Sequence, residues 1–447
     1  MRQKIIHVIG GGLAGSEACY QIAMRGIPVV LHEMRPQKTT EAHTTSHLAE
    51  LVCSNSFGSV SPHSASRILK DELKALGGFV LSVAESIAVP AGASLAVDRI
   101  KLSQIITETL ENHPLVTIHR EEVTELPQDA ICILATGPLT SKNLIQSLTP
   151  IFGDNSLYFY DAISPIISTD SLNLEKMYFA NRWDKGDSKD FLNIPLSEAE
   201  YNEFIDDILA AEVVLPHNFE EEKYFESCMP IEAIAARGRK TLAFGPMKPV
   251  GLNDPKTGKR PFAVIQLRTE NRHKTAYNLV GFQTKLKYKE QQRIFRKLPG
   301  LEEAEFLRLG SMHRNTYVDS PRLLNSNLQI KSQPQLFIAG QLTGTEGYLE
   351  STATGLIAGV NAARLFRDQN ALSLPEQTIL GSLLQTITDP ERIDFQPMNV
   401  NMGLFPPLED FKGKDKKLKN QLLSERSQSQ LKLWLSEIDW GFKPNFD

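Results

Sequence analysis

Three glycines and one acidic residue near the N-terminus have the types and spacing that hold a dinucleotide. Gly10, Gly12 and Gly15 form a G-x-G-x-x-G pattern, and Glu33 follows them by roughly 20 residues, as the fingerprint requires. The first glycine permits a tight turn, the second lets the backbone approach a pyrophosphate, and the third packs a helix on a strand. An acid at this spacing accepts hydrogen bonds from ribose hydroxyls and repels a 2′-phosphate, which favours FAD or NAD over NADP. The residues expected to line the pyrophosphate site are Gly10, Gly11, Gly12, Leu13, Ala14 and Gly15.

Two of the four cysteines stand in sequences that suit a reactive thiol. Cys53 lies in AELVCSNSFGS, which is typical of a loop near a pocket. Cys228 precedes a proline that is predicted to start a helix, and a thiol near a helix N-terminus gains thiolate character. Cys19 and Cys132 fall on a helix face and in a strand, where inert core cysteines are expected. Composition alone leaves a structural role open for the first pair as well, and no histidine spacing predicts a metal site with them.

Other segments could contact a substrate. MHRNT (312–316) places an imidazole beside a guanidinium and an amide, which suits a planar heterocycle, a phosphate or an ordinary surface turn. Basic clusters at 237–240, 268–274 and 285–297 suit either RNA phosphates or a solvated surface. If they bind RNA, the affinity should fall steeply with salt.

Short strands and helices must position the glycine pattern. Residues 5–9 predict a buried strand, and Ala14, Ala18 and Ile22 predict the inward face of the helix that follows. Residues 27–31 predict a second strand, which leads to the acid. This order of strand, glycines, helix, strand and acid is the context that the fingerprint requires.

Two later segments are predicted to return to the cofactor. ATGPLT (135–140) follows an apolar strand, and 336–359 combines a strand ending at Gly340, a glycine-rich loop and a helix from about Glu350. In two-dinucleotide-binding flavoproteins such strand ends contact FAD, and the helix N-terminus points at the flavin ring. Gly137 and Gly340 therefore join the expected site, and FAD is preferred over NAD. Because no second G-x-G-x-x-G follows a strand, NAD(P)H would have to enter the flavin pocket itself.

The chain of 447 residues is long enough for two or three domains. We expect an α/β fold with a Rossmann-like FAD-binding domain of the two-dinucleotide-binding type at 1–155 and 326–447. An α+β domain at 156–325 is expected to be inserted in it, on the substrate and RNA side. A helix at 422–438 should dock near the C-terminus through Leu431, Trp434, Leu435 and Ile438.

Composition narrows the class of protein. A net charge of −5 argues against wide, non-specific nucleic-acid affinity, although it allows a local basic footprint. No apolar run approaches the roughly 20 residues of a membrane helix, so no membrane partner is expected. The scattered cysteines and the absence of a secretory signal predict a cytoplasmic protein with free thiols.

With these segments in view, the chain resembles the folate- and FAD-dependent tRNA (uracil-5-)-methyltransferases, the TrmFO family. The resemblance runs nearly end to end and rests on many long motifs in the same order. They include VIGGGLAGSEA, ELVCSNSF, VPAGASLAVDR, ATGPLTS, FYDAISPI, CMPIE, GKRPFAVIQLR, MHRNT, AGQLTGTEGYLES and QPMNVNMGLFPPLE. The wider relative is the GidA/MnmG flavoprotein, which acts on a tRNA wobble uridine and has an additional C-terminal helical domain. One departure is Gly58, where the family usually carries an arginine, so a phosphate or cofactor contact is absent or supplied elsewhere.

The resemblance implies methylation of carbon 5 of the T-loop uridine in tRNA. Methylenetetrahydrofolate would donate the carbon, reduced FAD would carry it and supply a hydride, and NAD(P)H would restore the flavin. A cysteine thiolate would add to carbon 6, because carbon 5 of uracil is a poor nucleophile until that adduct forms. Carried over by motif, Cys228 is the nucleophile and Cys53 the acid/base partner, with the reverse assignment open. His313 would stack the folate pterin on the flavin, and Tyr348 would lie near the flavin.

Several alternatives stay open at this point. The same chemistry could act on ribosomal RNA, or the chain could modify a wobble uridine as GidA/MnmG does. The flavin fold alone would also fit a simple flavin oxidoreductase, and the basic clusters alone would fit a non-catalytic RNA-binding module.

Overall fold

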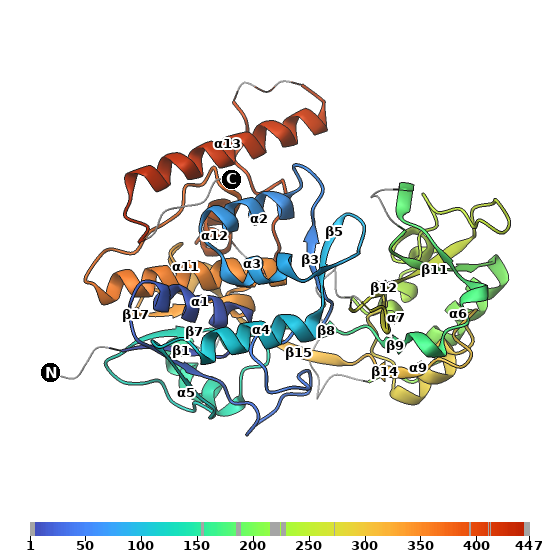
Figure 1. Ribbon diagram of the computed structural model, residues 1–447, viewed down its shortest axis with the longest axis horizontal. Helices are drawn as coiled ribbons and strands as arrows, with labels where there is room; N and C mark the ends of the chain where they lie inside the picture. The colour runs from blue at the N-terminus through green and yellow to red at the C-terminus, as the bar shows by residue number, and fades with distance from the viewer. Residues whose placement is uncertain are drawn as a thin grey trace.

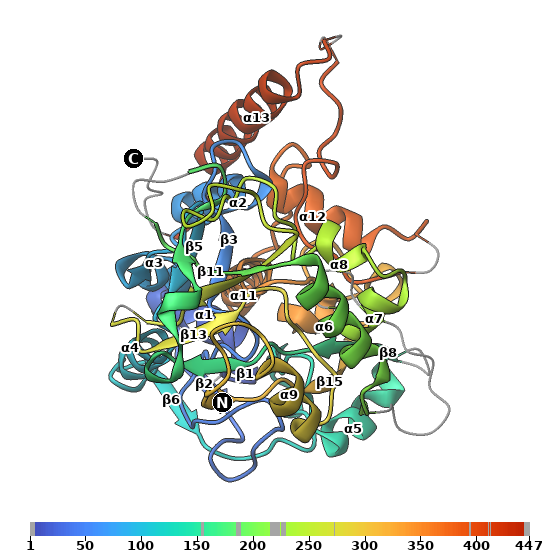
Figure 2. The ribbon, with the colours of Figure 1, turned by 90° about the vertical axis from the view of Figure 1, so that its right-hand side faces the viewer.

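The computed structural model describes residues 5–152, 156–184, 189–214, 224, 229–271, 273–392, 395–409, 411 and 413–441. For residues 156–161, His313 and Arg314 the description is confined to the backbone. Figure 1 shows a larger part, which contains the N-terminal segment, with a smaller part beside it, and in Figure 2 the smaller part lies in front of the larger one.

A six-stranded sheet forms the centre of the larger part, in the order β16-β17-β7-β1-β2-β6. All neighbouring strands are parallel except β16 and β17. The predicted strands at 5–9, 27–31 and 336–340 are confirmed with small shifts in their bounds. Those bounds are β1 (Ile6–Ile9), β2 (Val29–His32), β6 (Val116–His119), β7 (Ile131–Leu134), β16 (Gln329–Ile330) and β17 (Gln333–Ile338).

Two helices lie closely side by side on this sheet, α1 (Leu13–Met24) and α11 (Tyr348–Phe366). A Cβ atom at Gly355 would stand 2.3 Å from the Ala14 carbonyl oxygen, and one at Gly359 would stand 2.7 Å from that of Ala18. Small residues on both helices therefore set this close approach. The other helices of the larger part are α2 (Ala65–Ala75), α3 (Phe79–Ser86), α4 (Arg99–Glu111), α5 (Lys142–Phe152), α10 (Ser320–Leu323), α12 (Ile379–Thr388) and α13 (Lys416–Glu437).

A small antiparallel sheet corrects one of our predictions. We expected a loop at 49–59, but its last residues form β3 (Ser56–Ser59), which joins β4 (Ala88–Val89) and β5 (Ser94–Val97) in the order β3-β5-β4. These strands are too short for periodicity to predict them. β3 pairs with β5, which lies far along the chain, and a local pattern does not record such a pairing.

The smaller part is an α+β unit with its own core, as predicted. Its six-stranded antiparallel sheet has the order β10-β11-β12-β13-β9-β14. A separate antiparallel pair, β8 (Ser156–Ala162) and β15 (Met312–Val318), joins it to the larger part. MHRNT is therefore part of a strand, so the surface-turn interpretation of this segment is wrong. The remaining bounds are β9 (Ile166–Ser168), β10 (Tyr178–Phe179), β11 (Leu192–Leu196), β12 (Ala263–Thr269), β13 (Ala276–Leu279), β14 (Phe306–Arg308), α6 (Glu198–Ala210), α7 (Ile231–Ala236), α8 (Thr241–Phe244) and α9 (Tyr288–Phe295).

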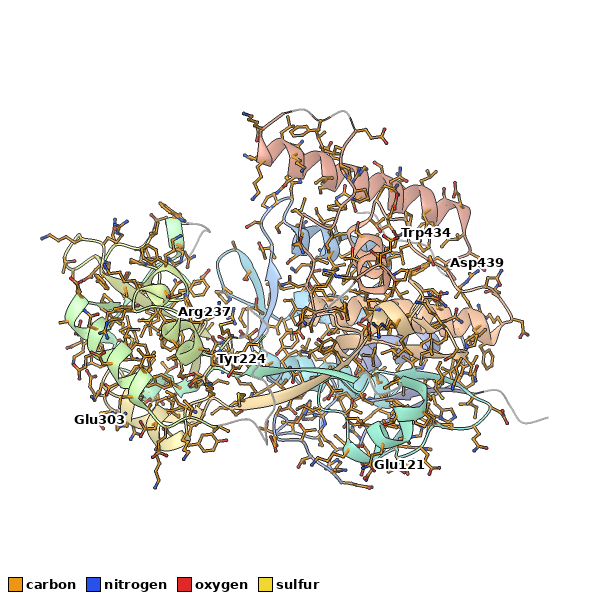
Figure 3. All side chains as sticks on the ribbon, turned by 180° about the vertical axis from the view of Figure 1, so that it is seen from behind. Glu121, Tyr224, Arg237, Glu303, Trp434 and Asp439 are labelled. Atoms are coloured by element: carbon orange, nitrogen blue, oxygen red, sulfur yellow. The ribbon has the colours of Figure 1, made fainter. Side chains whose placement is uncertain are left out.

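The last helix, α13, begins six residues before the predicted start because Asp415 caps it, its side chain accepting the backbone N–H groups of Lys417 and Leu418. Leu431 and Leu435 are buried as predicted. The ring of Trp434, a residue labelled in Figure 3, packs edge-on against Trp440 with ring centroids 5.7 Å apart. Among the described residues, the structure has no helix whose length and apolar character would let it span a membrane.

Candidate active site

A cleft of about 1070 Å³ opens at the ends of β1, β2 and β7. The structure brings together here nearly all the residues predicted to bind the dinucleotide. Those lining the cleft are Gly10, Gly11, Gly12, Leu13, Ala14, Glu33, Gly137, Gly340 and Tyr348.

The three pattern glycines meet different steric demands. Gly10 has φ +103°, and Gly15 lies against it, since a Cβ atom at Gly15 would stand 1.8 Å from the Gly10 carbonyl oxygen. A Cβ atom at Gly12 would meet nothing within 4 Å, because this position faces the open cleft. Gly12 is also the N-cap of α1, so the free backbone N–H groups of this helix lie beside the same space. These features form an anion site of the kind that a pyrophosphate fills.

Glu33 is buried at the wall of this cleft. One carboxylate oxygen accepts the Gly11 N–H at 3.0 Å, and both oxygens accept N–H groups of the Arg35 side chain at 3.0 Å. Burial alone would raise the pKa of Glu33, but the bonds and charge of Arg35 lower it below its ordinary value. The acid is therefore an ionised acceptor, as ribose recognition requires. Together with the open backbone at Gly12, it makes the cleft fit FAD.

Histidines gather at the same edge of the sheet. His7 Nδ1 lies 3.0 Å from His32 Nε2, and His32, His119 and Glu121 place potential ligand atoms within 4.8 Å of one another (Figure 3 labels Glu121). The prediction of no metal site considered only histidines near the two thiols, and it missed this group on neighbouring strands. Burial, and then the neighbouring histidines, lower the pKa of His32.

Cys53 lines a second cavity of about 1110 Å³ that shares a wall with the first. Its backbone N–H donates to the Tyr348 hydroxyl at 2.8 Å. Tyr348 is the first residue of α11 and lines both cavities, so its side chain connects the backbone of Cys53 with the dinucleotide cleft. Burial, and then the charge of Cys53, raise the pKa of Tyr348, so its hydroxyl stays protonated. The other residues common to both cavities are Val52, Pro138, Leu139, Gln341 and Ser351.

The other two predicted substrate-side residues lie outside the description. Cys228 is not among the described residues, and of His313 only the backbone in β15 is described. Asn315, two positions further along β15, lines the cavity of Cys53. As predicted, the proline after Cys228 starts a helix, because Pro230 is the N-cap of α7.

Gly58 also lines the second cavity, in the left-handed conformation with φ +81°. A Cβ atom there would lie 3.9 Å from Lys70 Nζ, so a buried cation already stands beside the position where the family usually has arginine. Burial lowers the pKa of Lys70 to about 8, while Glu350 opposes the shift.

The two remaining thiols are core residues, as predicted. Cys19 and Cys132 are free and fully buried. Burial raises the pKa of Cys132 to about 12 and that of Cys19 still further, so neither forms a thiolate near neutral pH.

Sequence reasoning missed three arginines around Cys53 and placed one of them wrongly. Arg99, Arg268 and Arg308 all interact electrostatically with Cys53. Arg268 was assigned to a basic surface cluster but is only 7% exposed, because it lies in the central strand β12. Alternation along the strand could not have revealed this, because β12 is buried on both faces and the neighbours Leu267 and Thr269 are buried too.

Much of the remaining basic sequence is neutralised within the protein. Arg239 pairs with Asp206, and Arg293 pairs with both Asp207 and Glu290. Such exposed pairs weaken the interpretation of these clusters as a continuous RNA footprint.

Comparison with known proteins identifies the family. The model of the family described as "Glucose inhibited division protein A" matches residues 5–370. A Geobacter sulfurreducens protein named "Methylenetetrahydrofolate--tRNA-(uracil-5-)-methyltransferase TrmFO" is 54% identical over 434 residues, which cover 97% of this chain and 99% of the relative. A protein of the same name from Dictyoglomus thermophilum is 52% identical over 427 residues, which cover 95% and 97%.

Solved structures support the fold. Two crystal forms of Aquifex aeolicus GidA superpose with TM-scores of 0.67 and 0.66, at 17% and 18% sequence identity. The matches cover 86% and 96% of this chain and 67% and 78% of the GidA chains. The expected Rossmann-like flavoprotein fold is thereby confirmed.

Proposed function

Since the chain belongs to the TrmFO family of methylenetetrahydrofolate--tRNA-(uracil-5-)-methyltransferases, we propose that it methylates the T-loop uridine of tRNA through Cys53 and Cys228. The reaction is folate-dependent methylation of uracil carbon 5 in tRNA, with FAD as cofactor and NAD(P)H as reductant. The alternatives of ribosomal RNA and of wobble-uridine modification are not favoured, because the relatives that match nearly the whole chain are named for tRNA uracil-5 methylation.

In this proposal the dinucleotide cleft holds FAD. The N–H groups at the start of α1 bind the pyrophosphate, Glu33 accepts the ribose hydroxyls, and the N-terminus of α11 faces the flavin. When bound, FAD supplies the carrier for the one-carbon unit and the hydride that completes the methyl group.

The second cavity receives the target base. The uridine must leave the T-loop stack, which costs a few kcal/mol. One thiol then attacks carbon 6 and the other exchanges the proton at carbon 5, and the family motif favours Cys228 for the attack. The observation that carries the proposal is the bond from Cys53 to Tyr348, at the wall between the two cavities.

The test uses purified protein, a T-loop transcript, labelled methylenetetrahydrofolate and NAD(P)H. We expect a yellow protein that labels the transcript, and a loss of at least roughly 10³-fold in rate for Cys53→Ala and for Cys228→Ala. Cys132→Ala is the matched control, since it removes a buried thiol away from both cavities. Activity retained by both site variants would refute the assignment. Mass mapping of an adduct with 5-fluorouridine RNA would show which thiol attacks.

We also propose a cytoplasmic location and direct access of NAD(P)H to the FAD cleft. The described cysteines are free thiols, as a reducing compartment requires.

A further inference from the structure

The surroundings of Cys53 are strongly cationic. Arg99 starts α4 and donates through Nη1 to the Leu51 carbonyl oxygen at 3.1 Å, two residues before the thiol. Arg308, at the end of β14, donates to the carbonyl oxygen of Ala42 at 3.1 Å, and Ala42 lines the cavity of Cys53. Arg268 comes from β12, and the next residue of that strand, Thr269, accepts the side-chain amide of Asn55 through its carbonyl oxygen at 3.0 Å, two residues after the thiol. Arg268 interacts electrostatically with both Arg99 and Cys53.

Among the described residues two carboxylates face this cluster, and both are already committed. Glu50 acts on Arg308 but is paired with Arg35 at 3.1 Å. Glu270 pairs through Oε2 with Arg99 Nε at 2.5 Å, and its other oxygen accepts the side-chain amide of Asn278. Within the described part of the chain, the Arg268 side chain has neither a hydrogen-bond acceptor nor an ion-pair partner. Its Nε atom and Nη2 of Arg99 are buried donors that bond to nothing in the described residues.

A buried and unpaired guanidinium is costly for a fold. Burial lowers the pKa of Arg268, Glu270 opposes this shift, and Arg99 adds to it. A buried donor without a partner calls for an explanation. The explanation that fits this position is an anion that arrives with the substrate.

We infer that Arg268, aided by Arg99, holds oxygen 4 of the target uracil while that oxygen carries negative charge. The inference rests on the proposed function and names the residues that stabilise its intermediate. When the thiolate sulfur bonds to carbon 6, the π electrons of the carbon 5–carbon 6 bond shift toward the carbonyl at carbon 4. Oxygen 4 thereby takes up the charge that the sulfur loses, and no oxidant or reductant is needed.

The burial of Arg268 favours this oxygen over other anions. A phosphate of the RNA backbone or a carboxylate of the folate tail is charged throughout and tends to stay at the hydrated mouth of a cavity. Oxygen 4 enters neutral and becomes charged only after the thiol adds. Donors that are fixed in advance at the site of developing charge stabilise such an intermediate strongly.

The test measures formation of the adduct without folate. A T-loop RNA with tritium at carbon 5 of the uridine releases it to water when the thiol adds, a solvent proton reaches carbon 5 and the adduct reverses. We expect Arg268→Met to slow this release by roughly 10²- to 10³-fold, with the dissociation constant for RNA unchanged. Arg268→Lys should keep part of the rate. Arg268→Met removes an unpaired buried charge. The midpoint of thermal unfolding of this variant should therefore equal or exceed that of the unmodified protein.

Arg293→Met is the matched control, because this arginine is half-exposed and already paired in the same part of the molecule. Release from Arg268→Met at the unmodified rate would overturn the inference. A loss that appears only as weaker RNA binding would assign the group to a phosphate, and a raised KM for folate would assign it to the folate tail. A lowered midpoint in both Arg268 variants would make the role structural. If the unmodified protein methylates RNA without exchanging tritium, the single-turnover methylation rates of Arg268→Met and the unmodified protein are compared in place of the release rates. No methylation by the unmodified protein would refute the proposed function instead.

Discussion

At the residue scale, the glycine pattern separates demands of the fold from demands of the ligand. Gly15 is required by the fold, since the Gly10 carbonyl oxygen occupies the space of any side chain there. Gly12 has free space around it and a φ of −74°, which any residue adopts. Its lack of a side chain therefore serves the dinucleotide alone.

Gly12→Ala should consequently lose FAD and keep its fold. We expect the free energy of unfolding of the FAD-free protein to change by less than about 1 kcal/mol, because the added methyl group meets no protein atom. Flavin absorbance after purification should fall, since the methyl group occupies the approach of the pyrophosphate. Gly15→Ala is the contrasting variant. Its added methyl group would overlap the Gly10 carbonyl oxygen, so it should lower the free energy of unfolding of the FAD-free protein by several kcal/mol, as overpacking does. Equal effects of both variants on unfolding would contradict this division.

Some residues of the site can be predicted from local sequence, and others cannot. The glycines, Glu33 and Cys53 were predicted because their spacing or flanking sequence is local. Arg268 was misplaced because its position depends on β12 being covered from both sides, which is decided by segments far along the chain. The number of partners of a charged side chain is likewise a property of the assembled fold.

At the element scale, one buried acid ties three helices together. Glu72 on α2 accepts the backbone N–H groups of Ile379 and Leu380 at 2.7 and 3.0 Å, at the start of α12. It also accepts the hydroxyl of Ser427 on α13. The sequence predicted part of α13, but nothing in a helical pattern marks a residue on the buried face of one helix as the cap of another.

Glu72 should make the stability depend on pH. Burial raises its pKa to about 7, against the opposing hydrogen bonds. Because the folded pKa exceeds that of the unfolded chain, the contribution is complete below the unfolded value and is lost as the pH rises toward 7. Between pH 5 and 7, the free energy of unfolding should fall by about 2 kcal/mol more in the unmodified protein than in Glu72→Gln. Denaturant titrations of the FAD-free protein measure this difference. The pH-dependent contributions of other buried acids such as Glu350 cancel in it, because both proteins contain them. Parallel slopes of the two proteins would contradict the assignment.

At the scale of the whole molecule, we propose a FAD-binding domain at 1–155 and 326–447 with a domain inserted at 156–325. The sequence predicted the second unit because helical and alternating patterns give its elements directly. How the two units contact each other was not predictable, since those contacts involve single polar residues. Asn55 is the clearest, with Nδ2 donating at 3.0 Å both to Val97 in the larger part and to Thr269 in the smaller part. Arg99 and Glu270 make a second bond across the same boundary.

Asn55→Ala should loosen this boundary and slow methylation without loss of FAD. The variant leaves two carbonyl oxygens without their donor, each worth about 1–3 kcal/mol when buried. The variant mainly weakens the contact between the two units, because Asn55 lies at their junction and not in the dinucleotide cleft. We expect faster amide hydrogen exchange at 266–270 and 94–98, with normal flavin content. Asn361→Ala is the matched control, since within the described part of the chain its buried amide bonds only to the larger part, at Asn327 and Leu372. It should lower stability to a similar degree and keep the methylation rate per folded molecule. If both variants slowed methylation equally, the rate would follow overall stability, and the positions of Cys53 and Arg268 would not depend on this junction.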